Sequence, residues 1–118
     1  MKLEIKCVTD ALMAINGNFS SGAMVNKSSI ELAISSAYKS KDWHEQLAYV
    51  VRALLCDHIF VDGNKRTTAA YIMAIFEDFK YRYDAFKIDR LVLKITKSNI
   101  TNVKTIRRMI KNAASKNF

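Results

Sequence analysis

The chain has 118 residues, of which half are hydrophobic, and it contains no proline and only three glycines. A chain of this length is expected to form a single domain over residues 1–118. The hydrophobic content argues against disorder, and the scarcity of proline and glycine argues against a turn-rich sandwich or barrel. The net charge of +8 favours an acidic protein, a nucleotide or a nucleic acid as partner, without choosing among them.

No apolar run is long enough to cross a membrane, and residues 1–10 lack the uncharged apolar stretch of a signal peptide. Cys7 and Cys56 are too few for a disulfide framework and have no metal-like spacing. We therefore expect a cytoplasmic protein whose thiols are reduced.

The first half of the chain has the apolar periodicity of three helices. The first is predicted over residues 6–16, and a loop containing two glycines follows over residues 17–27. Ser28 or Ser29 is expected to cap the second helix, and Asp42 to cap the third with Glu45 in a capping box. The third helix should end near Asp57. The expected inward residues of these two helices are Ile30, Ala33, Ile34, Ala37 and Tyr38, then Trp43, Leu47, Val50, Val51, Leu54 and Leu55.

The second half predicts a long central helix over residues 64–79, apolar nearly all round. Residues 88–97 fit a helix, although the alternation in LVLKIT also fits a strand. Thr101 is expected to cap a last helix. The inward residues would be Ala69, Ile72, Met73, Phe76 and Phe79 in the central helix, and Val103, Ile106, Met109, Ile110 and Ala113 in the last. The fold class is therefore expected to be all-α.

Residues 58–67, HIFVDGNKRT, join two predicted helices and carry most of the side chains suited to chemistry. The first N–H groups of a helix have no partner within it, and the helix dipole adds partial positive charge there. The amides of Gly63, Asn64, Lys65 and Arg66 are therefore expected to form a cradle for a phosphate. Gly63 allows a sharp turn, and the side chains of Lys65 and Arg66 add formal charge.

The same segment supplies the other parts of a phosphate-handling site. His58 has the side-chain type that most readily exchanges protons near neutral pH, which makes it the candidate general base. Asp62 offers a carboxylate to Mg²⁺, which binds through one or two carboxylates plus substrate phosphates. Phe60 is expected to point into the core and anchor the loop.

Some of these residues also have purely structural explanations. A histidine such as His58 often caps the end of a helix, and an aspartate such as Asp62 often caps the start of one. The pair Lys65 and Arg66 is harder to explain in that way, because cations at a helix start oppose the dipole, and such conflicts tend to mark functional sites. A P-loop is excluded, because its spacing is missing and no strand precedes the segment.

The segment HIFVDGNKRT resembles the signature H-x-F-x-D/N-A/G-N-K-R of the Doc (death on curing) branch of the Fic/Doc (Fido) superfamily. The Fic branch typically has H-P-F-x-D/E-G-N-G-R. SSIELAISSAY before the segment and TTAAYIMAIF after it are similar to the flanking helices of the family, so the resemblance covers roughly residues 6–115. It implies a compact all-α bundle with the motif loop between two central antiparallel helices.

The resemblance implies a role for each residue of the segment. His58 would take the proton from a target hydroxyl, and Asp62 would hold Mg²⁺ on the phosphates of ATP. The remaining implied roles are phosphate binding by the backbone of Gly63, Asn64 and Lys65, phosphate binding by the side chains of Asn64 and Arg66, and a structural role for Phe60. An upstream flap, roughly residues 19–27, would accept an extended target segment as an added strand.

Position 65 bears on the reaction. Fic enzymes with glycine there transfer AMP, whereas Doc has lysine and is reported to bind the nucleotide in the reverse sense, presenting the γ-phosphate. Lys65 has a long cationic side chain where glycine has none, so a reorganised phosphate site is physically reasonable. We therefore expect ATP-dependent phosphorylation of a Ser or Thr hydroxyl on a target protein, with AMP transfer (AMPylation) as the alternative.

The resemblance also bears on partners. The inhibitory pattern S/T-x-x-x-E-G/N of many Fic proteins is absent from the sequence. The resemblance then implies either an antitoxin protein, as in the toxin–antitoxin module of Doc and its Phd-type partner, or no inhibition of this kind. Family targets include translation elongation factor Tu, an acidic protein that the charge of +8 would suit.

Two alternatives belong to other classes. A basic nucleic-acid-binding module would use Lys104, Arg107, Arg108 and Lys111 on one face of the last helix, although such faces are more often simply solvated. A catalytically silent protein would keep the fold and bind only a partner, but the intact His58 argues against decay of the site. Nucleic acid is accordingly not the partner we expect.

Overall fold

The computed structural model describes residues 5–115, in which six helices and one short strand pair are present. The helices are α1 (Ile5–Asn16), α2 (Lys27–Ala37), α3 (Trp43–Cys56), α4 (Asn64–Asp78), α5 (Ala85–Lys97) and α6 (Val103–Ala113). The strands β1 (Arg82–Tyr83) and β2 (Ala114–Ser115) pair antiparallel. The predicted all-α class is confirmed.

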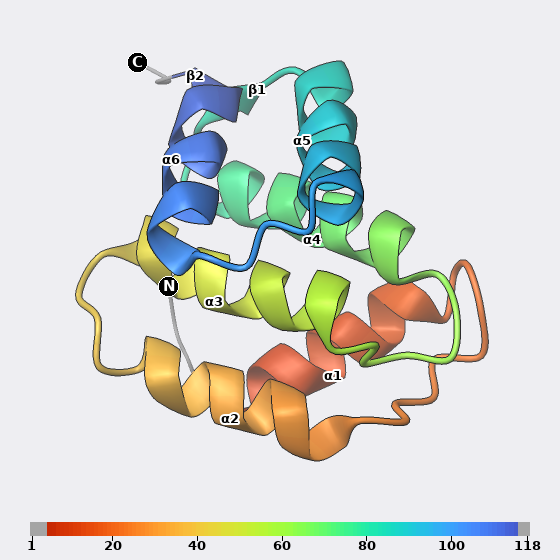
Figure 1. The fold of residues 1–118 in the computed structure, drawn as a ribbon. Coiled ribbons are helices and arrows are strands. Elements are labelled where there is room, and N and C mark those ends of the chain that lie inside the picture. The colour runs from red at the N-terminus through yellow and green to blue at the C-terminus, as the bar shows by residue number, and fades with distance from the viewer. Residues whose placement is uncertain (1–4, 116–118) are drawn as a thin grey trace.

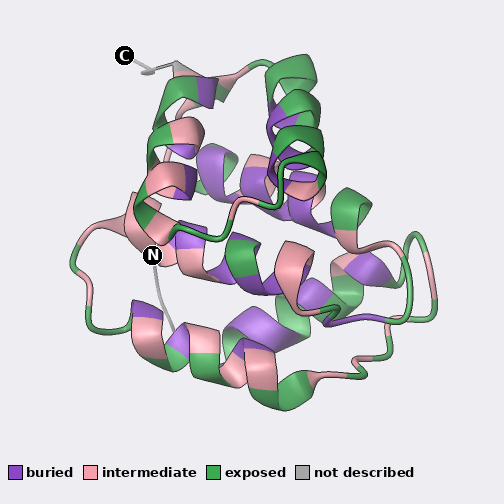
Figure 2. Ribbon diagram, in the orientation of Figure 1, coloured by how far each residue is buried: buried purple, intermediate pink, exposed green. Residues whose placement is uncertain are grey.

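The helices α3 and α4 form the centre of the molecule and run antiparallel (Figure 1). The first of them contacts α2, α4, α5 and α6, and the second contacts α1, α3 and α5. Buried residues concentrate on this central pair, whereas the outer faces of α5 and α6 are largely exposed (Figure 2). The motif loop, residues 57–63, joins the two central helices at one end.

One cluster of buried apolar side chains, drawn from all six described helices, forms the core. In α4 the buried positions include Tyr71, Ile72, Ile75 and Phe76, which explains why that helix is apolar nearly all round. Burial of each such large side chain stabilises the fold by about 1.5–3 kcal/mol relative to exposure. Among residues 5–115, each helix is too short or too polar to cross a membrane.

The predicted cap of α2 is wrong. The helix begins at Lys27, and its N-cap is Asn26, which makes no side-chain capping bond. Instead of capping, the hydroxyl of Ser29 donates to Oδ2 of Asp57 at 2.7 Å. The Ser29 hydroxyl is thus bonded to Asp57, which is distant in sequence, and is not used for capping. Neither Ser28 nor Ser29 caps the helix.

The predicted cap of α6 is also wrong, by one residue. Asn102 is the N-cap, and its Oδ1 accepts from the N–H of Thr105 at 3.1 Å. The carbonyl of Thr101 accepts instead from Nε of Arg52 on α3, at 2.7 Å. Residues 88–97 are helical as part of α5, so the strand alternative is wrong.

Some of the residues expected to face the core are only partly buried. Tyr38, expected inward, follows α2 as its C-cap and is 67% exposed. Met73 and Phe79 are half-buried, and Phe79 ends α4 as its C-cap. Tyr38 and Phe79 thus meet solvent at helix ends, where the apolar periodicity alone predicts burial.

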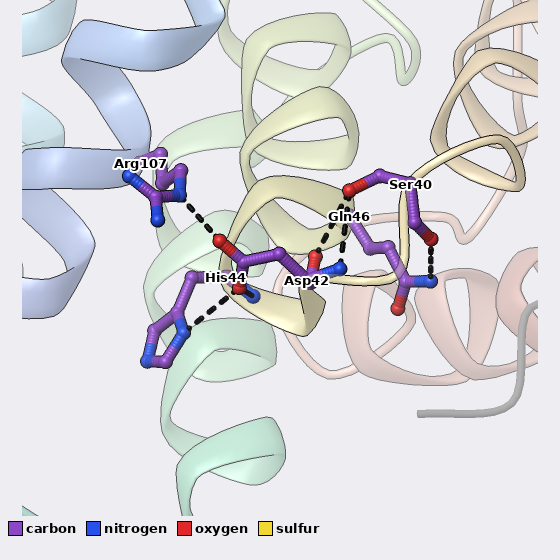
Figure 3. A network of polar contacts seen from close by, with 5 residues as sticks. All are labelled: Ser40, Asp42, His44, Gln46 and Arg107. Carbon is purple, nitrogen blue, oxygen red and sulfur yellow. Dashed lines mark hydrogen bonds and ion pairs between the residues drawn. The ribbon is translucent and has the colours of Figure 1, made fainter.

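Asp42 caps α3 as predicted and also joins α3 to α6 (Figure 3). Its Oδ1 accepts from the N–H of His44 at 3.0 Å, and its Oδ2 accepts from Nε of Arg107. The N–H of Asp42 donates to Oγ of Ser40 at 3.2 Å, so Ser40 takes the place predicted for Glu45 in the capping box. The carbonyl of Ser40 in turn accepts from Nε2 of Gln46 at 2.7 Å.

This network makes stability depend on acidity. Burial raises the pKa of Asp42, but hydrogen bonds from Arg107 and His44 outweigh it and lower that pKa from 3.8 to about 2. A carboxyl whose pKa is lower in the folded state stabilises the fold above its unfolded pKa, and this contribution disappears as the pH falls from about 4 to about 2. We expect Asp42→Asn to lower the free energy of unfolding at pH 6 and to have a much smaller effect at pH 2. Urea denaturation at both pH values measures the difference, and Asp84→Asn at the exposed N-cap of α5 is the control.

Candidate active site

The segment predicted to handle phosphate lines one cavity of about 430 Å³. The motif residues on its wall are His58, Val61, Asp62, Gly63, Asn64, Lys65 and Arg66, and the others are Phe19, Leu54, Leu55 and Thr96. The six polar or glycine positions proposed from sequence are therefore brought together. The seventh, Phe60, lies in the core with 1% of its surface exposed, where it can anchor the loop.

The start of α4 has the features of an anion-binding helix terminus. Gly63 is the N-cap, in the left-handed conformation with φ 76° and ψ 15°, which favours glycine. No side chain caps this helix, and no acidic residue lies in its first turn. The exposed side chains of Lys65 and Arg66 add charge where the helix dipole is already positive. The free amides and the two cations together suit a phosphate.

Asp62 changes the composition of the expected cradle. Its Oδ1 accepts from the N–H of Gly63 at 2.8 Å, so that N–H already has a partner. The amides left to bind an anion are therefore those of Asn64, Lys65 and Arg66, at the start of α4. The other carboxylate oxygen of Asp62, Oδ2, has no protein hydrogen-bond partner among the residues described.

Asp62 is the one carboxylate that the described residues place on the cavity wall, so a magnesium ion there would need further ligands from a substrate. Asp62 is exposed and lies on the cavity wall. Within residues 5–115, no three His, Cys, Asp or Glu side chains gather into a metal-ligand group. Mg²⁺ commonly binds through one or two carboxylates while substrate phosphates and water complete its shell. Asp62 would then be the protein ligand, and the ion would need the phosphates of a nucleotide.

Asn64 has a role that sequence reasoning missed. Its Oδ1 accepts from the N–H of Phe60, and its Nδ2 donates to the carbonyl of Phe60, both at 3.0 Å. This reciprocal pair closes the motif loop into a tight turn, and the Thr68 hydroxyl donates to the Asn64 carbonyl at 2.7 Å. The side chain that the resemblance assigns to phosphate binding is thus engaged with the loop, and the backbone N–H of Asn64 remains for the anion.

His58 lies directly after the C-cap of α3 and has a φ of 48°. Lys80 and Asn99 hold the same left-handed conformation after α4 and α5, with φ 63° and 51°. At those two positions the hydrogen bonds that usually close a helix end are present, for example from the N–H of Tyr81 to the carbonyl of Phe76 at 2.9 Å. Among the described residues, His58 has no such pair, so its conformation is maintained by something else.

The 17–26 loop, the segment between α1 and α2, holds the backbone on both sides of His58. Nδ2 of Asn26 donates to the carbonyl of Asp57 at 2.7 Å. The N–H groups of Val25 and Asn26 donate to the carbonyl of Ile59 at 2.8 and 3.2 Å. The carbonyls of Asp57 and Ile59, the residues before and after His58, are thus both held from this loop. Holding a non-glycine residue in this conformation costs about 1–2 kcal/mol.

Asn16, the last residue of α1, is the second position that sequence reasoning missed. It is fully buried, and its Nδ2 lies 2.8 Å from the carbonyl of Asp62 and 3.0 Å from Oγ1 of Thr67. Its Oδ1 accepts from the N–H of Gly22 at 3.0 Å. No local pattern could have identified this residue, because 46 positions separate Asn16 from Asp62.

The basic stripe predicted on α6 is interrupted. Arg107 is half-buried and donates to the carboxylate of Asp42 (Figure 3). Lys104, Arg108 and Lys111 are exposed. One of the four predicted phosphate contacts is therefore already engaged in joining α6 to α3, which weakens the nucleic-acid alternative.

Comparison of the chain with protein-family models, with curated proteins and with solved structures gave no match. Support for a function therefore comes from the cavity, from the side chains on its wall and from the resemblance of residues 58–67 described above.

Proposed function

We propose that this protein transfers the γ-phosphate of ATP to a Ser or Thr hydroxyl of a target protein, as a Doc-like toxin would. One observation carries the proposal. A histidine, a carboxylate and a cationic helix N-terminus line the same cavity of about 430 Å³. That volume lies within the usual range of small-molecule sites, about 300–1,000 Å³.

The residues of the cavity have the chemistry that the reaction needs. A ring nitrogen of His58 takes the proton of the target hydroxyl while its oxygen forms a bond to the γ-phosphorus. The bond from the γ-phosphorus to the oxygen shared with the β-phosphate breaks, and ADP leaves with the electron pair. The amides at the start of α4, with Lys65 and Arg66, stabilise the negative charge on the phosphoryl oxygens. Magnesium, held by Asp62, would neutralise further phosphate charge.

The position of the label on ATP separates this reaction from AMP transfer. The protein is incubated with candidate targets, elongation factor Tu first, and with ATP labelled on its γ- or its α-phosphate. We expect label on the target only from the γ position. Label transferred only from the α position would show that Lys65 does not redirect the nucleotide, and AMP transfer would replace phosphorylation.

Asp62 is expected to control the magnesium requirement. Asp62→Asn keeps an acceptor for the N–H of Gly63 but removes the charge that binds the ion. The Mg²⁺ concentration for half-maximal transfer should rise at least about tenfold. Titration of MgCl₂ at fixed ATP measures it, with Asp10→Asn as control, since Asp10 is an exposed carboxylate paired with Lys6 on α1. An unchanged magnesium requirement in Asp62→Asn would show that Asp62 does not hold the ion.

A target segment would have a free backbone edge beside the cavity. Met24 pairs with Phe60 in an antiparallel bridge, and the neighbouring N–H of Val25 donates to Ile59. Because Val25 donates across the bridge, Met24 and Phe60 are a non-hydrogen-bonded pair, in which the N–H and C=O of Met24 point away from the motif loop. An extended target segment would add there as a strand, with main-chain hydrogen bonds and little demand on sequence.

A second candidate function is binding of an acidic protein partner at α5 and α6 without catalysis. Ten of the 19 Lys and Arg residues, but two of the 11 Asp and Glu residues, lie between residues 80 and 113. Lys87, Arg90 and Lys94 line a groove of about 270 Å³ whose wall also contains Leu91 and Met109. Apolar and cationic side chains together favour an acidic protein segment over nucleic acid. A wild-type protein that binds such a partner but never transfers label would favour this function over catalysis.

A further inference from the structure

We propose that the 17–26 loop and its flanking Asn16 form a clamp with two separable ends, in which Asn26 positions the base and Asn16 positions the phosphate cradle. The inference rests on the proposed function and assigns positioning residues to its site. Neither asparagine lines the cavity, and each acts through the backbone of the motif loop.

The Asn26 end determines where His58 lies. Its Nδ2 holds the carbonyl of Asp57, and its N–H, together with that of Val25, holds the carbonyl of Ile59. These bonds fix the peptide group before His58 and the Ile59–Phe60 peptide one residue beyond it, and His58, between them, has a left-handed backbone that lacks the closing bonds found at Lys80. Loss of the Asn26 side chain lets this backbone relax and displaces the imidazole. Displacement of a reacting group by about 1 Å can reduce a rate about a hundredfold.

The Asn16 end determines where the cradle lies. The carbonyl that its Nδ2 holds belongs to the peptide bond between Asp62 and Gly63, and this peptide leads directly into α4. The same Nδ2 reaches Oγ1 of Thr67, one turn into that helix. Asn16 therefore fixes the turn on both sides of the first amides of α4. Its buried amide cannot be replaced by water without rearrangement of these groups.

The loop between the two asparagines also forms part of the cavity. Phe19 lies on the cavity wall, and a Cβ placed on Gly63 would lie 3.5 Å from Cβ of Phe19. The main bonds at the two ends are alike in kind, each from an asparagine Nδ2 to a carbonyl of the motif loop, at 2.8 and 2.7 Å. Two merely structural bonds should change kcat and the Kd for Mg·ATP together, in proportion to lost stability, whereas a clamp predicts that each variant changes a different one.

The test compares Asn26→Ala and Asn16→Ala in transfer and in binding of Mg·ATP by calorimetry. Asn26→Ala is expected to lower kcat at least about tenfold and to leave the Kd for Mg·ATP within about twofold of wild type. Asn16→Ala is expected to raise that Kd at least about tenfold and to change kcat at saturating ATP by no more than about threefold. Asn16→Ser, which removes both N–H donors of Nδ2 without burying a charge, serves if Asn16→Ala does not fold, and the same rise in Kd is expected.

Parallel losses of kcat and affinity in both variants, in proportion to lost stability, would overturn the clamp. A wild-type protein that neither binds Mg·ATP nor transfers label would instead refute the proposed function. In that case amide hydrogen exchange tests the clamp independently of activity. Faster exchange confined to residues 57–59 in Asn26→Ala, and to Gly22 and residues 63–67 in Asn16→Ala, supports it. Faster exchange throughout the protein in both variants contradicts it.

Discussion

Replacement of His58 by glycine is expected to abolish transfer and at the same time to stabilise the protein. The imidazole is the proposed base, and its removal should lower the rate by about 10²–10⁴-fold. The left-handed backbone at this position, with φ 48°, favours glycine. Relief of that strain, less the greater freedom of glycine in the unfolded chain, should raise the free energy of unfolding by about 0.5–1 kcal/mol. Transfer assays and urea denaturation measure the two effects.

Lys80→Gly is the matched control for His58→Gly. Lys80 follows the C-cap of α4 with φ 63° and is not part of the cavity wall. It should gain a similar stability, while its transfer rate and its Kd for Mg·ATP should equal those of wild type. If His58→Gly retains transfer, His58 is not the base. If it loses stability where Lys80→Gly gains it, the backbone strain at His58 has been misjudged.

Gly63→Ala is expected to damage stability and phosphate binding together. A Cβ at this position would lie 3.1 Å from Nδ2 of Asn16, and φ 76° is strained for any residue with a side chain. Asn16 must move, so its bond to the carbonyl of Asp62 is lost or weakened. We expect the free energy of unfolding to fall by about 1–2 kcal/mol. The Kd for Mg·ATP, measured by calorimetry, should rise at least about tenfold as the cradle is displaced.

A core variant controls for the loss of stability in Gly63→Ala. Ile106 is fully buried on α6 and is not part of the cavity wall, and Ile106→Val should cost about 0.5–1.5 kcal/mol. Its Kd for Mg·ATP should remain that of wild type. Equal loss of affinity in both variants would mean that the effect of Gly63→Ala comes from general destabilisation.

Much of the fold was predictable because apolar periodicity reports which side of a helix is buried. The spacing of Leu47, Val50, Val51 and Leu54 predicted α3, and all four residues are buried. The cap at Asp42 was predictable because the capping bond is local, to the N–H of His44. The same carboxylate binds Arg107, which is 65 positions away, and that contact depends on how α6 packs on α3. The bond between Asp42 and Arg107 could therefore not be predicted from the sequence.

In the candidate site too, the contiguous residues could be predicted from the sequence and those from distant segments could not. His58 to Arg66 are contiguous, so their meeting at one cavity required only a loop that leads into a helix. The residues that hold the loop in place, Asn16 and Asn26, lie in other segments and carry no distinctive local pattern. Similarly, the failure of Ser29 to cap α2 follows from the approach of Asp57, which only the packed structure contains.

The most direct measurement of the central claim is the change in backbone amide NMR shifts when Mg·ATP is added to the wild-type protein. The phosphate cradle predicts that the largest changes occur at Asn64, Lys65 and Arg66, with saturation at a single affinity. The basic groove of α5 and α6 provides the internal comparison, since Lys87, Arg90 and Lys94 would attract any anion. Shifts confined to that groove, or an absence of change at the start of α4, would contradict the proposed site.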